Sequence, residues 1–299
     1  MARAKRRHTE AVKRAEQRST RVMWAGMLVG GAVAVGVFLV PKFREPTEET
    51  VAPVEIPPAD SQPAASKAEI EALRTRVLKR YPHDTKAFTQ GLIWHDGFVY
   101  ESTGQYGKSS LRRVRLDDGK VLSERKLDRE LFGEGLARVD EMLITLTWRS
   151  GQAIVSEVDT LEKRGTLRYD GEGWGLCFDG TSLIMSDGSS TLTVRDPETL
   201  KVLRRVMVRQ DGIPVRMLNE LECVGSHVYA NIWRRQEIVR IHSATGEVTA
   251  SIDARGLLSR EEAARADVLN GIAYKPDTET FLLTGKLWPA VFEVEFIPR

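Results

Sequence analysis

The sequence has few of the residues that build metal sites. It contains two cysteines and five histidines among 299 residues, and none of them has the spacing of an HExxH or CxxC motif. We therefore expect no cofactor and no catalytic transition metal, while a structural calcium ion stays open. The net charge is only +2, so the chain as a whole gives no electrostatic reason to bind nucleic acid.

The two cysteines, Cys177 and Cys223, allow two interpretations. An exported chain can join such a pair as a disulfide. However, they lie at different offsets from a repeated motif described below. A one-residue offset places strand side chains on opposite faces of a sheet. We therefore expect two buried free thiols rather than a disulfide.

Long hydrophobic runs are also absent, with one exception near the N-terminus. Residues 22–40 include no charged side chain, and at about 1.5 Å per residue they span roughly 28 Å, enough to cross a hydrocarbon core. Residues 1–21 carry eight Lys or Arg and two Glu. A basic stretch, 41–44, stands where a signal peptide has a small-residue cleavage site. This pattern predicts an uncleaved transmembrane signal anchor, which explains the basic arm better than a nucleic-acid tail.

The charge asymmetry also predicts an orientation. The basic arm, residues 1–21, should stay in the cytoplasm, and the rest of the chain should face the periplasm or the extracellular side. Residues 41–66 are rich in Pro, Ala and acidic side chains, a composition that predicts a semi-extended tether. The folded domain is then expected over residues 67–299.

A Gly-Leu motif or a close relative recurs five times within that domain. The copies begin about 44, 40, 45 and 51 residues apart, a period typical of propellers; they start at Gly91, Gly135, Gly175, Glu220 and Gly271. Each copy precedes short alternating segments bounded by Gly, Asp and Pro, which predict antiparallel strands with one buried face. Five units of four strands predict an all-β, five-bladed β-propeller. Residues 260–264 predict a short helix before the fifth unit.

The residue before each motif changes in chemistry from copy to copy. We call this position the slot; it holds Gln90, Glu134, Trp174, Asn219 and Asn270. A radial repeat brings equivalent positions together, so these side chains should meet at one mouth of the central channel. About thirteen residues later the second strand returns to that rim, with Trp148, Asp187, Trp233 and Lys286 in units two to five. One carboxylate among amides and indoles indicates a site rather than a core.

Nine strings along the chain resemble the glutaminyl-peptide cyclotransferases of the plant and bacterial type. They occur in the expected order from Tyr81 to Phe296: YPHDTKAFTQGL, ESTGQYGKSSLR, GEGL, LTW, GEGWGL, LNELE, ANIW, DVLNGIAY and TGKLWP. The resemblance implies a five-bladed propeller without a catalytic metal. It also implies an enzyme that converts the N-terminal glutamine of peptides or proteins to pyroglutamate and releases ammonia.

The resemblance also implies roles for individual residues. Glu134 matches the catalytic glutamate. Asn219 and Lys286 match polar groups that supply donors during catalysis, and Gln90 matches a polar contact to the substrate. The pocket tryptophans match Trp148, Trp174 and Trp233. Asn270 joins the substrate-binding set because it occupies the slot of the fifth unit.

The chemistry agrees with these residue types. One carboxylate can carry the proton from the attacking α-amine to the departing nitrogen, and Glu134 is the one carboxylate in the slot, where nearby indoles should raise its proton affinity. Two other functions stay open: a non-catalytic peptide-binding propeller and, less in keeping with the slot, a metal-dependent propeller hydrolase. Glu172 is equally open to a structural or a functional role. Arg112, Arg113 and Arg115 are expected on a charged surface.

Overall fold

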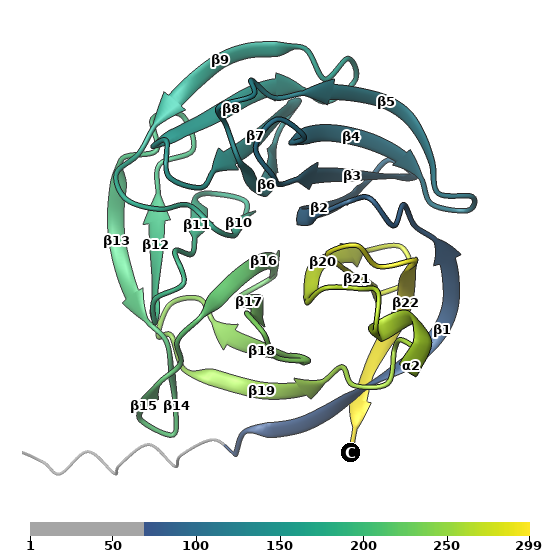
Figure 1. Cartoon of the computed structure of the whole chain (residues 1–299). Coiled ribbons are helices and arrows are strands. Elements are labelled where there is room, and N and C mark those ends of the chain that lie inside the picture. Colours follow the sequence, from purple (N-terminus) through teal and green to yellow (C-terminus); the bar gives the residue numbers. More distant parts are fainter. Residues whose placement is uncertain (1–68) are drawn as a thin grey trace, which may run out of the picture. The chain divides into compact units, whose positions relative to one another are not determined.

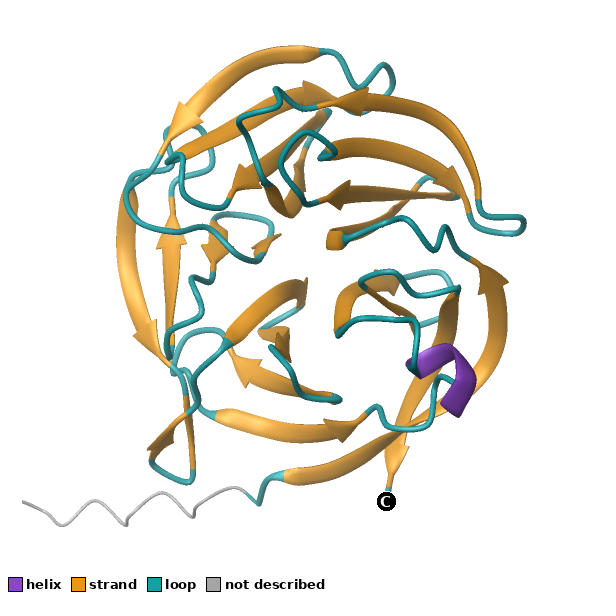
Figure 2. Cartoon of the chain, in the orientation of Figure 1, coloured by secondary structure: helices purple, strands orange, loops and turns teal. Residues whose placement is uncertain are grey.

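The computed structural model describes residues 69–299, and these form an all-β, propeller-like fold (Figures 1 and 2). Four-stranded units stand radially around a common axis, and we number these blades 1 to 5. Blades 1 to 3 are separate sheets, whereas blades 4 and 5 join into one eight-stranded sheet. Blade 1 contains β2 (Thr89–His95), β3 (Phe98–Thr103), β4 (Ser110–Arg115) and β5 (Lys120–Lys126). Blade 2 contains β6 (Gly133–Val139), β7 (Met142–Thr147), β8 (Gln152–Glu157) and β9 (Lys163–Arg168).

The other blades follow the same order. Blade 3 contains β10 (Leu176–Phe178), β11 (Leu183–Met185), β12 (Thr191–Arg195) and β13 (Val202–Met207). Blade 4 contains β16 (Leu218–Val224), β17 (His227–Ile232), β18 (Glu237–His242) and β19 (Val248–Asp253). Blade 5 contains β20 (Leu269–Lys275), β21 (Thr280–Gly285), β22 (Ala290–Pro298) and β1 (Glu71–Pro82). A small hairpin of β14 (Arg209–Gln210) and β15 (Ile213–Pro214) lies between blades 3 and 4 in the chain.

The outer strand of blade 5 comes from the N-terminal end of the fold. Strand β1 pairs antiparallel with β22 from Leu73 to Pro82 and parallel with β19 from Glu71 to Arg74. It therefore closes the ring and joins blade 4 to blade 5. The helix predicted before the fifth unit is confirmed as α2 (Arg260–Ala263), which begins with a capping box from Ser259.

Buried apolar side chains fill the spaces between neighbouring blades. In β7, Leu143 packs in a cluster with blade 1, whereas the next residue, Ile144, packs in a cluster with blade 3. Consecutive residues of a strand point to opposite faces, so the inner strands are buried on both faces. The prediction of one buried face per strand is therefore wrong for them; the outer strand β5 alternates between partly buried and exposed residues instead.

The expectation of two free thiols is also wrong, because Cys177 and Cys223 form a disulfide with Cα atoms 5.4 Å apart. Cys177 lies on β10 and Cys223 on β16, the inner strands of blades 3 and 4. The parity argument placed them correctly on opposite faces of their strands. Neighbouring blades pack face to face, however, so opposite faces of two adjacent blades point toward each other and bring the two sulfurs together.

Removing this disulfide should destabilise the propeller. The bond closes a loop with a sequence separation of 46 residues, and the chain-entropy model gives such a loop about 4 kcal/mol of stability. We expect the double variant Cys177→Ala/Cys223→Ala to lose about this much in urea unfolding. Reduction of the wild-type protein should reproduce the loss and leave the variant unchanged. An unaltered unfolding midpoint in both cases would contradict a stabilising bond.

Among residues 69–299, no helix has the length and apolar character needed to span a membrane. The predicted anchor, residues 22–40, and the regions assigned to 1–21 and 41–66 lie outside the described residues.

Candidate active site

The slot residues lie at interruptions of the inner strands. The pairing of each inner strand with its neighbour shifts between Thr89 and Gly91 in blade 1 and between Gly133 and Leu136 in blade 2. Equivalent shifts occur between Leu218 and Leu221 and between Leu269 and Ile272. A bulge takes a residue out of the regular ladder and redirects its side chain. This local irregularity explains how a strand position in four blades presents a polar group at the mouth.

The glycines of the repeated motif are required by close approach of neighbouring blades. A Cβ atom on Gly135 would lie 2.5 Å from the backbone nitrogen of Leu176, and one on Gly175 would lie 2.0 Å from the carbonyl oxygen of Asn219. No side chain fits where two inner strands meet backbone to backbone. The repeated glycine is thus a packing requirement, and the variable residue before it is available for function.

Three slot residues form a directed chain of hydrogen bonds. Asn270 Nδ2 donates to the carbonyl oxygen of Thr89 at 3.0 Å and to Gln90 Oε1 at 3.2 Å. Gln90 Nε2 in turn donates to Glu134 Oε1 at 2.9 Å. Because the Thr89 carbonyl accepts only, it fixes the orientation of the Asn270 amide, and that amide fixes Gln90. Glu134 Oε1 is therefore held as an acceptor, and Oε2 is the oxygen left to carry or receive a proton.

The side chains of Glu134 and Lys286 are buried near each other, and each shifts the pKa of the other. Burial raises the pKa of Glu134 well above its usual value, and the Lys286 charge counteracts this rise in part. Burial lowers the pKa of Lys286, while the charges of Glu134 and Asp267 counteract this fall. The Lys286 ammonium lies 4.9 Å from the centre of the Phe88 ring. As expected from the sequence, Glu134 has a raised proton affinity, although burial as a whole is its main cause.

The fourth slot residue, Asn219, is 2% exposed, and its carbonyl oxygen accepts a hydrogen bond from Ser186 Oγ at 2.7 Å. The next residue, Glu220, stands where the other motifs have glycine. Its carboxyl group accepts from the backbone nitrogens of Ile272 at 2.8 Å and Leu92 at 3.3 Å. It therefore ties blade 4 to blades 1 and 5, and burial raises its pKa well above normal.

The three predicted pocket tryptophans are all partly buried, and Glu172 links two of them. Glu172 Oε2 accepts from the indole nitrogens of Trp148 at 2.8 Å and Trp174 at 3.1 Å. Arg149 Nε donates to the other oxygen at 2.8 Å. The Trp174 and Trp233 rings meet edge to face, with centroids 5.6 Å apart. The structure thus gives Glu172, which the sequence left undecided, the position of a clamp that orients the aromatic wall.

Two aromatic residues near the mouth escaped the sequence analysis. Phe132 packs against Phe88 and Trp148, with centroids 6.2 and 5.6 Å away, and Phe88 lies under the Lys286 ammonium. Both phenylalanines stand two residues before a slot residue, as Glu172 does before Trp174. The same repeat that revealed the slot therefore carries a second variable position, and reading it would have found all three residues.

The return of the second strand to the rim is confirmed by one repeated backbone hydrogen bond. The nitrogens of Trp148 and Lys286 donate to the carbonyl oxygens of Phe132 and Val268, each at 2.9 Å. Trp233 donates to Met217 in the same way at 2.8 Å. Blade 3 departs from this pattern, and its predicted rim residue, Asp187, is exposed and caps the turn at Ser189.

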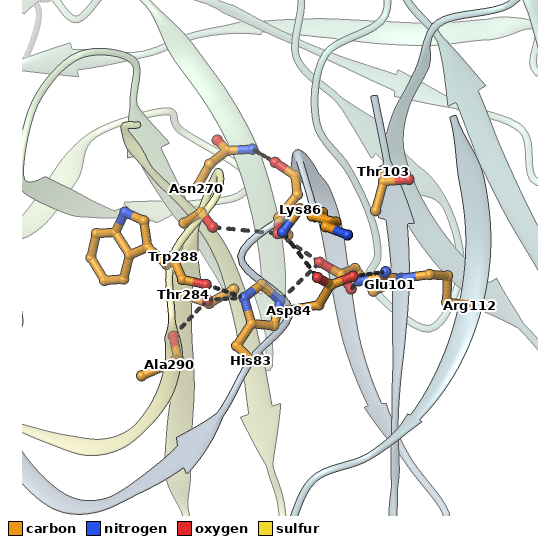
Figure 3. A network of polar contacts seen from close by, with 12 residues as sticks. His83, Asp84, Lys86, Glu101, Thr103, Arg112, Asn270, Thr284, Trp288 and Ala290 are labelled. Atoms are coloured by element: carbon orange, nitrogen blue, oxygen red, sulfur yellow. Dashed lines mark hydrogen bonds and ion pairs between the residues drawn. The ribbon is translucent and has the colours of Figure 1, made fainter. Parts of the chain in front are cut away.

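A buried charged network supports the mouth where blade 5 meets blade 1 (Figure 3). His83 Nδ1 lies 2.8 Å from the Trp288 carbonyl oxygen, and Nε2 lies 3.1 Å from Glu101 Oε1. Both neighbours are acceptors, an arrangement that favours an imidazolium whose two ring nitrogens both donate. Arg112 donates to the other Glu101 oxygen and to Asp84. Thr89 Oγ1 donates to Glu101 Oε1 at 2.6 Å, which connects the network to the residue before Gln90.

The charges of this network stabilise one another. Burial alone would lower the pKa of His83, but Glu101 raises it above its usual value. Burial alone would raise the pKa of Glu101, but His83 and Arg112 hold it far below normal. The expectation that Arg112 lies on a charged surface is wrong, because it is 5% exposed and paired on both sides. Arg115, on the same strand, fits that expectation and pairs with Asp118 at the surface.

These two arginines make a matched test of the network. Arg112→Met leaves the buried carboxylate of Glu101 with one partner fewer, and breaking such a pair costs about 3–5 kcal/mol. We expect urea unfolding of this variant to show a loss of that size. Arg115→Met removes an exposed pair on the same strand and should leave the midpoint nearly unchanged. Equal effects of the two substitutions would contradict a special contribution of the buried network.

Within residues 69–299, no group of three or more His, Cys, Asp or Glu side chains is placed to hold a metal ion.

Comparison with known proteins now adds a family to this geometry. The sequence profile of the glutamine cyclotransferase family matches residues 51–296. The chain belongs to the glutamine cyclotransferase family. It is 41% identical over 225 residues to a glutaminyl-peptide cyclotransferase of Arabidopsis thaliana, covering 73% of this chain and 70% of that protein. The crystal structure of Myxococcus xanthus glutaminyl cyclase matches with a TM-score of 0.73 and 38% identity, over 77% of this chain and all of that one.

Membership of the glutamine cyclotransferase family confirms the resemblance seen in the nine sequence strings. The similarity extends across all the blades, because the matched region includes every slot and rim residue described above. The individual roles assigned to Glu134, Lys286, Asn219, Gln90, Asn270 and the three tryptophans stay predictions, which the geometry makes specific enough to test.

Proposed function

We propose that the mouth of this five-bladed propeller is the active site of a glutaminyl-peptide cyclotransferase. The chain is an enzyme that converts an N-terminal glutamine to pyroglutamate and releases ammonia. The observation that carries the assignment of the site is the buried Glu134 carboxyl, oriented by Gln90 and Asn270 and faced by Lys286. The indoles beside it supply a wall for a small neutral side chain.

In the proposed reaction, the α-amine nitrogen attacks the γ-carboxamide carbon of the same residue. A carbon–nitrogen bond forms, and the amide oxygen takes the negative charge of the tetrahedral intermediate. Glu134 receives the proton that the amine loses and delivers it to the departing nitrogen. The original bond between the carboxamide carbon and the amide nitrogen then breaks, the carbonyl group forms again, and ammonia leaves. The raised pKa of Glu134 suits the first transfer, because a carboxylate with a higher proton affinity is a stronger base toward the amine. The protonated carboxyl group can then return the proton to the departing nitrogen.

The neighbouring polar groups divide the remaining tasks. The Lys286 ammonium and the Asn219 amide are donors for the developing oxyanion, which fixed donors stabilise in a site with little water. Gln90 holds the Oε1 atom of Glu134 in place. Among residues 69–299, the Oδ1 atom of Asn270 is buried and has no hydrogen-bond partner, so it can accept a hydrogen bond from the substrate. Trp148, Trp174 and Trp233 then enclose the glutamine in the folded shape that ring closure needs.

The decisive experiment measures ammonia release from peptides that begin with glutamine, with and without a chelator. We expect release that the chelator leaves unchanged, together with a product that has lost the mass of one ammonia. Peptides that begin with asparagine should react far less, because their cyclisation would need a four-membered ring. Binding of glutamine peptides without ammonia release would instead favour the peptide-binding propeller. Release that stops with chelator would favour the metal-dependent alternative.

We further propose that the enzyme is anchored in a membrane through residues 22–40 and that its propeller faces the periplasm or the extracellular side. The disulfide between Cys177 and Cys223 supports this orientation, because such bonds persist in oxidising compartments. Protease added to cells with a permeabilised outer envelope should degrade the propeller. Protection of the propeller, or a mature N-terminus beyond residue 40, would contradict the proposal.

A further inference from the structure

A cavity of about 460 Å³ lies between the β14–β15 hairpin and the end of β17, and Trp233 forms part of its wall. Its apolar side includes Ile213, Pro214 and Met217, and its charged lining residues are Asp211, Arg216 and Arg235. Ile213 is 70% exposed and Met217 is 39% exposed, which is a high exposure for large apolar side chains. We call this cavity the hairpin pocket.

The hairpin pocket is continuous with the tryptophan wall of the mouth. Trp233 N donates to the Met217 carbonyl oxygen at 2.8 Å, and Met217 N donates to Gly188 O at 2.9 Å. Gly188 in turn lies against the Trp174 ring, since a Cβ at that position would come within 2.7 Å of it. Trp233 thus has one neighbour in the mouth, the Trp174 ring, and also borders the hairpin pocket. Met217 stands two residues before the slot residue Asn219, as Phe88 and Phe132 do before theirs.

Two of the three charged residues that line the hairpin pocket are arginines, and a further arginine, Arg234, lies beside Trp233. Arg216 is exposed and forms no ion pair with a carboxylate among residues 69–299. Arg234 stacks on Trp233 with its guanidinium carbon 4.3 Å from the ring centre. The positive charge of Arg235 is balanced by its ion pair with Glu237. Arg216 is therefore the lining arginine available to a ligand that carries negative charge, and Arg234 lies against the wall formed by Trp233.

We propose that the hairpin pocket binds the residues that follow the N-terminal glutamine of the substrate, and that it favours acidic side chains there. The inference rests on the proposed function, because it takes the glutamine to lie among Glu134 and the tryptophans. The peptide then has to leave the mouth past one of its walls, and each further residue extends it by about 3.3–3.6 Å. Trp233 separates the mouth from the hairpin pocket by one side chain, so the second and third residues reach the arginines.

The test compares kcat/KM for glutaminamide, which has no further residue, with peptides carrying Glu, Ala or Lys at positions two and three. In the wild type we expect the order Glu, Ala, Lys, with up to about a fivefold step for each exposed charge pair. Arg216→Glu should abolish or reverse that order, mainly through KM. Its activity on glutaminamide should stay at the wild-type level. Added salt should reduce the preference, because exposed charges are screened.

Arg205→Glu is the matched control, since it makes the same charge change at an exposed position of the outer strand β13. It should keep the wild-type order of peptides. The hairpin pocket is ruled out as a subsite if Arg216→Glu keeps the wild-type order, or if both variants shift it equally through a long-range field. A wild-type enzyme that releases no ammonia even from glutaminamide has a different meaning, because that result removes the proposed function on which the subsite rests.

Discussion

Substitution of Glu134 by Gln should lower kcat by roughly 10²–10⁴, the usual contribution of general acid–base catalysis. The glutamine side chain keeps the size of Glu134 and can still accept the hydrogen bond from Gln90 Nε2. It has no titrating proton site, however, so it cannot pass a proton between the two nitrogens. The substrate should still bind, because the tryptophans and amides that contact it are unchanged, and the loss should therefore appear in kcat rather than KM.

Glu172→Gln is the matched control for this experiment. Glu172 accepts hydrogen bonds from the indoles of Trp148 and Trp174 and contributes negative charge near Glu134. Its position suits it to orient the two indoles rather than to meet the reacting atoms. The Glu172→Gln substitution should therefore raise KM more than it lowers kcat. Thermal melts of both variants separate catalysis from folding. A Glu134→Gln enzyme with near wild-type kcat would rule out the proposed proton transfer.

Substitution of Lys286 by Met should produce the second largest loss, about 10²–10³ in kcat, which is typical for one oxyanion donor. Methionine keeps the length of the side chain over Phe88 and removes the ammonium. Lys275→Met is the control, because Lys275 belongs to the same blade and pairs with Glu293 away from the mouth. We expect that control to keep wild-type turnover. A Lys286→Met enzyme with unaltered kcat would exclude the ammonium from the reaction.

The same variant should also move the pH profile. The positive charge of Lys286 lowers the pKa of Glu134, which burial raises. Without that charge, Glu134 should hold its proton to higher pH. If ionised Glu134 accepts the proton from the amine, the acidic limb of the kcat profile should shift to higher pH in Lys286→Met and stay in place in Lys275→Met. A merely structural lysine would leave the limb unmoved.

Part of the fold and site was predictable because a radial repeat translates sequence position into spatial position. The period of the Gly-Leu motif indicated blades, and the slot named Gln90, Glu134 and Asn270 before their contacts were known. The structure shows these three in one hydrogen-bonded chain. The position two residues before the slot would have added Phe88 and Phe132, because it recurs in the same repeat.

Other features depended on which blades face each other, and no single strand pattern contains that information. Arg112 stands on one short strand with Arg113 and Arg115, as in a charged surface segment, yet Asp84 and Glu101 enclose it in the fold. Cys177 and Cys223 lie on opposite faces of their strands, and only face-to-face packing of adjacent blades joins them.

The sequence by itself determined the all-β repeat, the identity of the side chains at the mouth and the family that carries them. Tertiary structure alone decided that strand β1 completes blade 5 and that Glu220 ties blade 4 to blades 1 and 5. It also decided that burial as a whole is the main cause of the raised pKa of Glu134. The physical reason is that periodicity depends on the geometry of one strand. Burial, charge coupling and pairing between blades arise only when the ring closes and segments distant in sequence come into contact.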